Sequence, residues 1–203
     1  MKLYNSVGPN PHVVRMFMAE RGITLPLEEI DIMKGLNREA GYLKTNPAGQ
    51  APTLVLDDGS VITEILAICE YLDETQPGDS LIGKTPEARA QTRRWTRWAD
   101  LNIVEPLANG FRYSEGLPMF EPRMRCLPEA AAGLKAKAQD GQAFMDAQLA
   151  SRDFVAGDTF TLADVLLFCF LGFGGAVGQP LNPDLKNIGR WYASVAARPS
   201  AAA

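Results

Sequence analysis

The first 76 residues change their hydrophobic period several times, which is typical of short strands and helices in alternation. Residues 2–5 alternate as in a strand, whereas Val14, Phe17 and Met18 recur at helical spacing. The pattern predicts, in order, a strand at 2–5, a helix from Asn10-Pro11 to Gly22, a strand at 27–32, a short helix at 37–44, two strands within 52–63, and a helix at 64–74. The order β-α-β-α-β-β-α predicts a small α/β domain over residues 1–76.

Particular residues mark where these elements begin and turn. Asn10 before Pro11 is the pattern of an N-cap followed by proline at the first helical position. Asp58-Gly59 predicts a tight turn between the last two strands. Thr63 stands where it would cap a helix beginning at Glu64.

From Pro86 onward the pattern is helical or irregular, which predicts an all-α domain over residues 86–203. Long helices are expected around 93–104, bent or ended by Pro106, and at 128–150, 161–173 and 182–199. The segment 161–173 is apolar nearly all round, so it is expected at the buried centre. Thr161 and Asp164 form a variant of the capping box at its start.

Residues 77–85 join the two predicted domains, although GDSLIGKT within them matches the phosphate-loop pattern G-x-x-x-x-G-K-[ST]. A phosphate loop follows a buried strand, and here an amphipathic helix precedes it. Pro86 instead makes Thr85 the N-cap of the next helix. We interpret the segment as an interdomain linker.

Composition narrows the class of protein. The 203 residues are 46% hydrophobic and 22% charged, with a formal net charge of -4, which argues against a nucleic-acid partner. The clustered Arg89, Arg93, Arg94 and Arg97 fit a solvated face or an interface. No apolar run is long enough to span a membrane. Three scattered cysteines and one histidine, His12, predict no disulfide framework, no metal site and a reducing, cytoplasmic location.

Several segments resemble the cytosolic glutathione S-transferase superfamily, in the same order and along nearly the whole chain. They are NPAGQAPTL (46–54), LDDGSVITEILAICEYLDE (56–74), LIGKTPEARA (81–90), FVAGDTFTLADV (154–165) and WYASVAARPS (191–200). Together with VGPNPHVVRMFMAERGI (7–23), they look most like the bacterial and fungal branch with atypical catalytic residues. The resemblance implies a thioredoxin-like α/β N-terminal domain, an all-α C-terminal domain and glutathione as co-substrate.

The resemblance also implies a glutathione site in the first domain. The proline matching Pro52 is cis in this fold, and Ala51 would pair through its backbone with the cysteinyl part of the tripeptide. Glu64 would take the γ-glutamyl ammonium, and the amides of Glu64 and Ile65 would take its carboxylate. Gln50 and Lys34 are further candidate contacts. Taken without the resemblance, Pro52 is a strand-start proline, Glu64 a first-turn acid and Lys34 a solvated lysine.

The sequence departs from the family pattern where the glutathione thiol is activated. Ile65 replaces the serine usual after the glutamate, so one hydroxyl contact is lost. Ser6 comes early in the first loop, and Asn10 stands where the activating group is expected. In the atypical yeast branch a serine and a histidine of the fourth helix orient a water, and the matching residues here are Ala108 and Arg112.

Electrostatics therefore replaces a dedicated base in the expected mechanism. Asn10, Ser6, Arg112 and the first helix N-terminus are the candidate groups that stabilise the thiolate. A small hydrophobic electrophile would lie against Phe111, Tyr113, Leu117 and Met119, whose plain alternative is packing within the helical domain.

Other functions stay open at this level. The main alternative is a binding protein that holds glutathione conjugates or hydrophobic ligands with little turnover. Glutathione-dependent ether cleavage or peroxide reduction is a further alternative. A thiol-disulfide oxidoreductase is disfavoured because no cysteine follows the first strand.

A homodimer is expected, since RRWTRWADL and the helix of the 60s offer apolar and arginine surface that relatives pair across a two-fold axis.

Overall fold

Four short strands form the mixed sheet of the first part of the chain. The computed structural model describes residues 1–203, which divide into Met1–Leu81 with Pro199–Ala203, and Ile82–Arg198. The strands β1 (Lys2–Asn5), β2 (Leu27–Glu29), β3 (Thr53–Val55) and β4 (Val61–Ile62) lie in the order β2-β1-β3-β4. β2 is parallel to β1, whereas β3 is antiparallel to both β1 and β4. The predicted strand order along the chain is confirmed, although β2 is shorter than expected.

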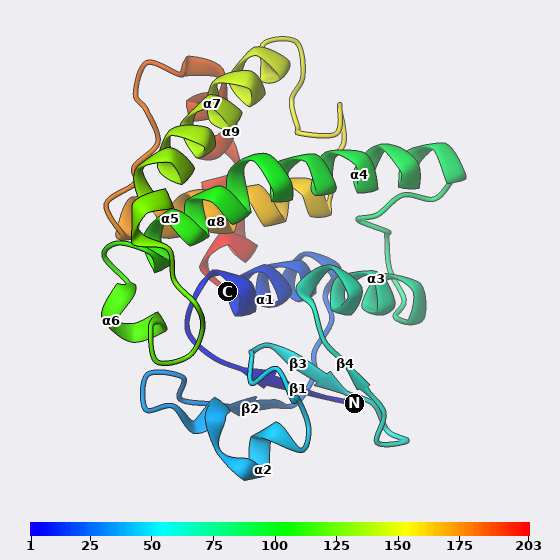
Figure 1. Ribbon diagram of the computed structural model, residues 1–203. Coiled ribbons are helices and arrows are strands. Elements are labelled where there is room, and N and C mark those ends of the chain that lie inside the picture. The colour runs from blue at the N-terminus through cyan, green and yellow to red at the C-terminus, as the bar shows by residue number, and fades with distance from the viewer. The chain divides into compact units, whose positions relative to one another are not determined.

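Helices α1 (Pro9–Arg21) and α3 (Ile65–Thr75) cover one face of this sheet, and the short α2 (Ala40–Leu43) lies on the other (Figure 1). The core between the sheet and the two long helices is apolar. Its fully buried side chains include Leu3, Val14, Phe17, Leu54, Ile68 and Leu72. A 3₁₀ turn at Pro199–Ala202 packs against α1, so the last five residues group with the first unit rather than with the helical one.

Two helix starts differ from the sequence prediction. Asn10 is not the N-cap of α1, because the helix begins two residues earlier than predicted, at Pro9, and Gly8 is the N-cap at φ 106°. Thr63 is not the cap of α3, because Glu64 occupies that position at φ 67°. Proline suits the first helical position at residue 9 as well as at residue 11, so the pattern alone did not separate the two.

The second unit is helical throughout. Its elements are α4 (Pro86–Ala99), α5 (Glu105–Arg112), α6 (Leu117–Phe120), α7 (Ala131–Leu149), α8 (Leu162–Ala176) and α9 (Lys186–Ala196). The apolar α8 is the most buried helix, as predicted, and α4 packs against it, while α7 packs against α5 and α9. Thr85 caps α4 by accepting from the Ala88 amide at 3.2 Å, which confirms the predicted cap.

A π-helical segment, Asp100–Val104, joins α4 to α5 in one continuous helical run. Pro106 lies in the first turn of α5 and has no N–H to donate to the carbonyl four residues earlier. The loss of that hydrogen bond favours a local widening of the helix. Pro106 therefore does not end the helical run, and a π-helical segment lies just before it.

Asp164 connects three segments of the helical unit. Its carboxylate accepts hydrogen bonds from the amides of Val155 and Thr161 at 2.8 and 2.9 Å, and from Trp191 Nε1 at 2.9 Å. The Thr161 hydroxyl completes the predicted capping box at the start of α8. Asp164 is fully buried, so these donors replace the water that a carboxylate would otherwise bind.

Candidate functional site

The predicted glutathione contacts of the first unit lie at one edge of the sheet, the edge that is formed by the ends of its strands. Because β3 is antiparallel to both β1 and β4, β1 and β4 run in the same direction. β1, β2 and β4 therefore end at the edge where β3 begins. The segments at that edge are the start of α1 with Asn10, the loop with Lys34, residues 50–52, and Glu64 with the start of α3.

The start of α3 combines an exposed carboxylate with free helix amides. Glu64 is the only residue other than glycine with positive φ, at φ 67° and ψ 123°. Such a conformation is unfavourable for a side chain with a Cβ and is typical of functional sites. No side chain caps the first turn of α3. The amides of Ile65 and Leu66, rather than those of Glu64 and Ile65, are thus the first-turn donors.

A buried hydrogen-bond network holds the segment before β3. The Gln50 carbonyl accepts from the Tyr42 hydroxyl at 2.6 Å and from Asn46 Nδ2 at 2.8 Å. Burial raises the pKa of Tyr42, so its hydroxyl stays a donor. The Ala51-Pro52 bond is cis, as predicted. The Ala51 backbone takes part in no hydrogen bond within the chain, so its N–H and C=O are available to a ligand.

The candidate thiol-activating groups are less favourable than the sequence suggested. The Ser6 hydroxyl is buried and donates to the Ile30 carbonyl at 2.5 Å, so it does not serve a ligand. Asn10 lies in the first turn of α1, half-buried. Pro9 and Pro11 have no N–H, so Asn10 supplies the one backbone donor among the first three helical positions. Asn10, at the start of α1, therefore remains a candidate thiol-activating group, and Ser6 does not.

Lys34 is exposed and already has a partner. Its ammonium lies 3.2 Å from Asp31 Oδ2, and its amide donates to Asp31 Oδ1 at 3.0 Å. The amide and then the ammonium of Lys34 hold the pKa of Asp31 below its ordinary value. A ligand carboxylate would have to share the lysine with this aspartate.

The other predicted residues belong to the second unit, where they lie together on α5, α6 and the turn between them. Phe111 packs edge-on against Phe120 and Phe173, with ring centroids 6.1 and 5.3 Å apart. Arg112 donates to Asn109 Oδ1 at 2.8 Å and lies 5.7 Å from the Phe120 ring centroid. Tyr113, Leu117 and Met119 are half-buried beside them. These residues form an aromatic cluster, in which Arg112 is partly neutralised by Glu105 at 3.8 Å.

Sequence reasoning missed the residues that support the site. Tyr42 and Asn46 were not assigned a role, although Asn46 lies in the NPAGQAPTL segment. The positive φ of Glu64 has no sequence signal, because glycine is the residue expected in such a conformation. The paired prolines at 9 and 11 were a readable signal that the first turn of α1 lacks amides.

An N-terminal thioredoxin-like domain followed by a helical domain, with these features at one sheet edge, defines the class of glutathione-dependent transferases. The family description "Glutathione S-transferase, N-terminal domain" matches residues 7–75, and "Glutathione S-transferase, C-terminal domain" matches residues 117–199. The chain belongs to the glutathione S-transferase family. The resemblance drawn from the sequence and the expected fold are thereby confirmed.

Individual relatives match over nearly the full chain. Glutathione S-transferase 2 of Saccharomyces cerevisiae is 30% identical over 205 residues, which cover 98% of this chain and 87% of the yeast protein. Glutathione S-transferase GstA of Escherichia coli O157:H7 is 30% identical over 203 residues, covering 98% and 94%. The crystal structure of a glutathione S-transferase domain-containing protein from Marinobacter aquaeolei VT8 superposes with a TM-score of 0.94 at 34% identity, covering 99% of this chain and 100% of that chain.

Proposed function

We propose that this protein transfers glutathione to a small hydrophobic electrophile. The observation that carries the proposal is the start of α3, where the exposed Glu64 carboxylate and the free amides of Ile65 and Leu66 stand together. The γ-glutamyl end of glutathione has an ammonium and a carboxylate on one carbon. At this helix start the Glu64 carboxylate would bind the ammonium, and the amides would bind the carboxylate. Ala51 would pair with the cysteinyl backbone, which directs the thiol toward the start of α1.

The chemical step forms a sulfur–carbon bond. The glutathione thiol loses its proton to solvent, the thiolate attacks an electrophilic carbon, and a leaving group such as a halide departs with the electron pair of the broken bond. A free thiol has a pKa of about 8.5, so lowering it by two units requires roughly 2.7 kcal/mol of thiolate stabilisation. Asn10 is proposed as the nearest donor, through its side-chain amide and its backbone N–H.

Steady-state turnover of glutathione with a generic aryl halide, beside calorimetric titration with glutathione, tests this function. Binding with turnover supports a transferase. Binding without turnover supports the second candidate, a protein that holds glutathione or its conjugates. That candidate is favoured by the engaged Ser6 hydroxyl and by the two prolines that remove amides from the first turn of α1. Absence of binding contradicts both.

Asn10→Ala is expected to raise the pKa of the bound thiol by about one unit and to lower kcat near neutral pH about tenfold, because a charge-assisted hydrogen bond is lost. Ultraviolet absorbance of the thiolate, followed against pH, measures the pKa, and kcat should recover at alkaline pH. Ser6→Ala is the control, expected to leave the thiol pKa unchanged. A raised pKa in Ser6→Ala with none in Asn10→Ala would reverse the assignment.

A homodimer is the proposed assembly. On the helical unit, Phe144 and Leu101 are 45% and 44% exposed, and the Trp98 ring lies 4.5 Å from that of Phe144. Apolar side chains beside the arginines of α4 fit an interface better than a solvated face. Analytical ultracentrifugation at micromolar concentration is expected to give twice the chain mass. A single species at 22.1 kDa would contradict the proposal.

A further inference from the structure

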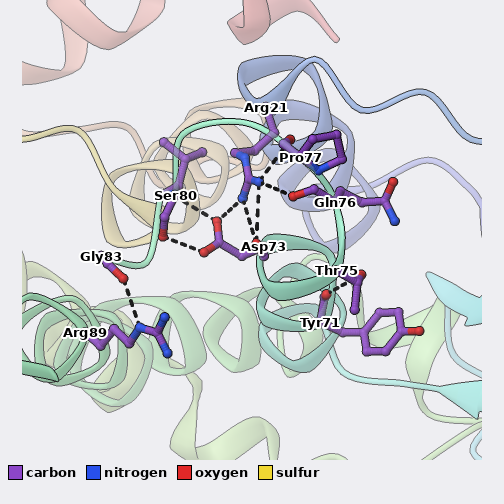
Figure 2. Close-up of polar contacts among 10 residues, drawn as sticks. Arg21, Tyr71, Asp73, Thr75, Gln76, Pro77, Ser80, Gly83 and Arg89 are labelled. Carbon is purple, nitrogen blue, oxygen red and sulfur yellow. Dashed lines mark hydrogen bonds and ion pairs between the residues drawn. The ribbon is translucent and has the colours of Figure 1, made fainter. Parts of the chain in front are cut away.

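Arg21 and Asp73 form a buried ion pair far from the sheet edge that carries the proposed site. Arg21 is the last residue of α1, and Asp73 lies in the last turn of α3. Their side chains are only 1% and 6% exposed. In Figure 2, Asp73 lies between the Arg21 guanidinium on one side and Ser80 on the other.

The guanidinium binds the end of α3 at more than one point. One nitrogen donates to Asp73 Oδ1, and the other donates to the carbonyls of Gln76 and Pro77 at 2.9 and 3.3 Å (Figure 2). Carbonyls at a helix C-terminus lack helical partners and attract a cation. A planar guanidinium with several fixed donors sets direction as well as distance, which a lysine ammonium does not.

Asp73 in turn holds the chain that follows α3. Its Oδ2 accepts from the Ser80 hydroxyl at 2.5 Å, and its Oδ1 accepts from the Leu81 amide at 2.9 Å. The pair therefore joins the end of α1, the end of α3 and residues 80–81 through directional hydrogen bonds.

The proposed site lies at the N-terminal ends of α1 and α3, whereas the ion pair lies at their C-terminal ends. They follow β1 and β4, which run in the same direction, and both pack on one face of the sheet, so the two helices are parallel (Figure 1). Asn10 and Glu64 thus lie at one end of the helix pair, and Arg21 and Asp73 at the other. The two helices pack against each other, and both bury apolar side chains, among them Phe17 and Ile68. Apolar contact is non-directional and fixes axial register weakly.

We propose that the Arg21–Asp73 pair is a positioning device for the glutathione site. It fixes the axial register of α1 against α3, so that the first turns bearing Asn10 and Glu64 meet one bound glutathione together. This inference rests on the proposed function. The simpler role is general stabilisation of the fold, which would lower the thermal midpoint of a variant without changing its affinity for glutathione. The two roles therefore predict different outcomes.

The double substitution Arg21→Met/Asp73→Leu removes both charges together, so neither charge is left unpaired. It also removes the hydrogen bonds to Gln76, Pro77, Ser80 and Leu81. Calorimetry is expected to show glutathione affinity weakened about tenfold, because a displaced Glu64 loses much of its charge-assisted hydrogen bond to the ammonium. The KM for glutathione should rise in parallel while the KM for the electrophile stays constant. The thermal midpoint should fall as well, because the polar groups that Arg21 and Asp73 bind lose their partners.

Asp146→Asn is the matched control in the helical unit. Asp146 accepts from the amides of Asn187 and Ile188 at 2.7 and 2.9 Å, so this substitution weakens a comparable clamp between α7 and α9. It is expected to lower the thermal midpoint without changing the KM for glutathione. A double variant that loses stability but keeps the wild-type glutathione affinity would overturn the positioning role.

Asp73→Asn keeps the size of the side chain and serves if the double variant does not fold. Backbone amide chemical shifts of its ligand-free form are expected to change at Asn10 and at Ile65–Ala67, as well as near residue 73. Changes confined to the helix ends around Arg21 and Asp73 would contradict the proposal. This measurement needs no ligand, so it remains decisive if wild type fails to bind glutathione, an outcome that would defeat the proposed function instead.

Discussion

Replacing Glu64 by glutamine is expected to weaken glutathione binding about tenfold to a hundredfold with little loss of folding stability, because a charge-assisted hydrogen bond becomes a neutral one. Glutamine preserves the size of the side chain, and the exposed Glu64 carboxylate caps no amide of its own helix. Ile65 contributes no hydroxyl, so recognition of the γ-glutamyl group rests on the Glu64 charge and the amides beside it. Calorimetry together with thermal melts measures both quantities.

A second substitution separates the side chain of Glu64 from its backbone. Glu64→Gly removes the carboxylate but relieves the positive φ, so it should weaken binding as much as glutamine does while raising stability by about 1 kcal/mol. Glu74→Gln, an exposed glutamate at the other end of α3, is the matched control and should change neither. Affinity within twofold of wild type in Glu64→Gln would remove the γ-glutamyl assignment.

Asp164→Asn is expected to lower the free energy of unfolding by about 3 kcal/mol and the thermal midpoint by on the order of 10 °C. Asparagine places an NH₂ group at one of the two carboxylate oxygen positions. That group then faces either the donors of Val155 and Trp191 or the two donors of Thr161, all of them buried. Circular dichroism melts and denaturant titration measure the change. A loss below 1 kcal/mol would mean that the helical unit does not depend on this carboxylate.

The same comparison gives a pH dependence with a definite sign. Burial raises the pKa of Asp164 to about 6 from its ordinary 3.8, against the hydrogen bonds that favour the charged form. A raised pKa means that the folded protein binds the proton more tightly than the unfolded chain does. The resulting stability is complete below pH 3.8 and is lost as the pH rises through 6. The stability difference between wild type and Asp164→Asn should therefore widen from pH 7 to pH 5, and a constant difference would contradict the shift.

Elements with strong local chemistry were predictable from the sequence. The Asp58-Gly59 hairpin, the Thr85 cap and the Thr161–Asp164 capping box all appear as expected, because each depends on residues that are neighbours in the chain. The predicted start of α1 was wrong, because Gly8-Pro9 and Asn10-Pro11 satisfy the same local rule and the helix begins at the first of them.

The site was predictable as a set of residues but not in its geometry. Glu64 and Pro52 were found through family segments, whereas no motif in the sequence indicates the positive φ of Glu64. The Ser6 hydroxyl failed as a candidate because its partner, the Ile30 carbonyl, is 24 residues away in the sequence. No periodicity or motif reports such a long-range hydrogen bond.

The π segment at Asp100–Val104 has a consequence for comparing this chain with its relatives. An α-helix turns by about 100° per residue, so a gain or loss of one residue inside the run from α4 to α5 changes the phase of everything after it. An insertion here lengthens no loop and leaves the run helical, yet it decides which side of α5 Ala108 and Arg112 occupy. A residue correspondence at these two positions is therefore meaningful only between chains that share the π segment.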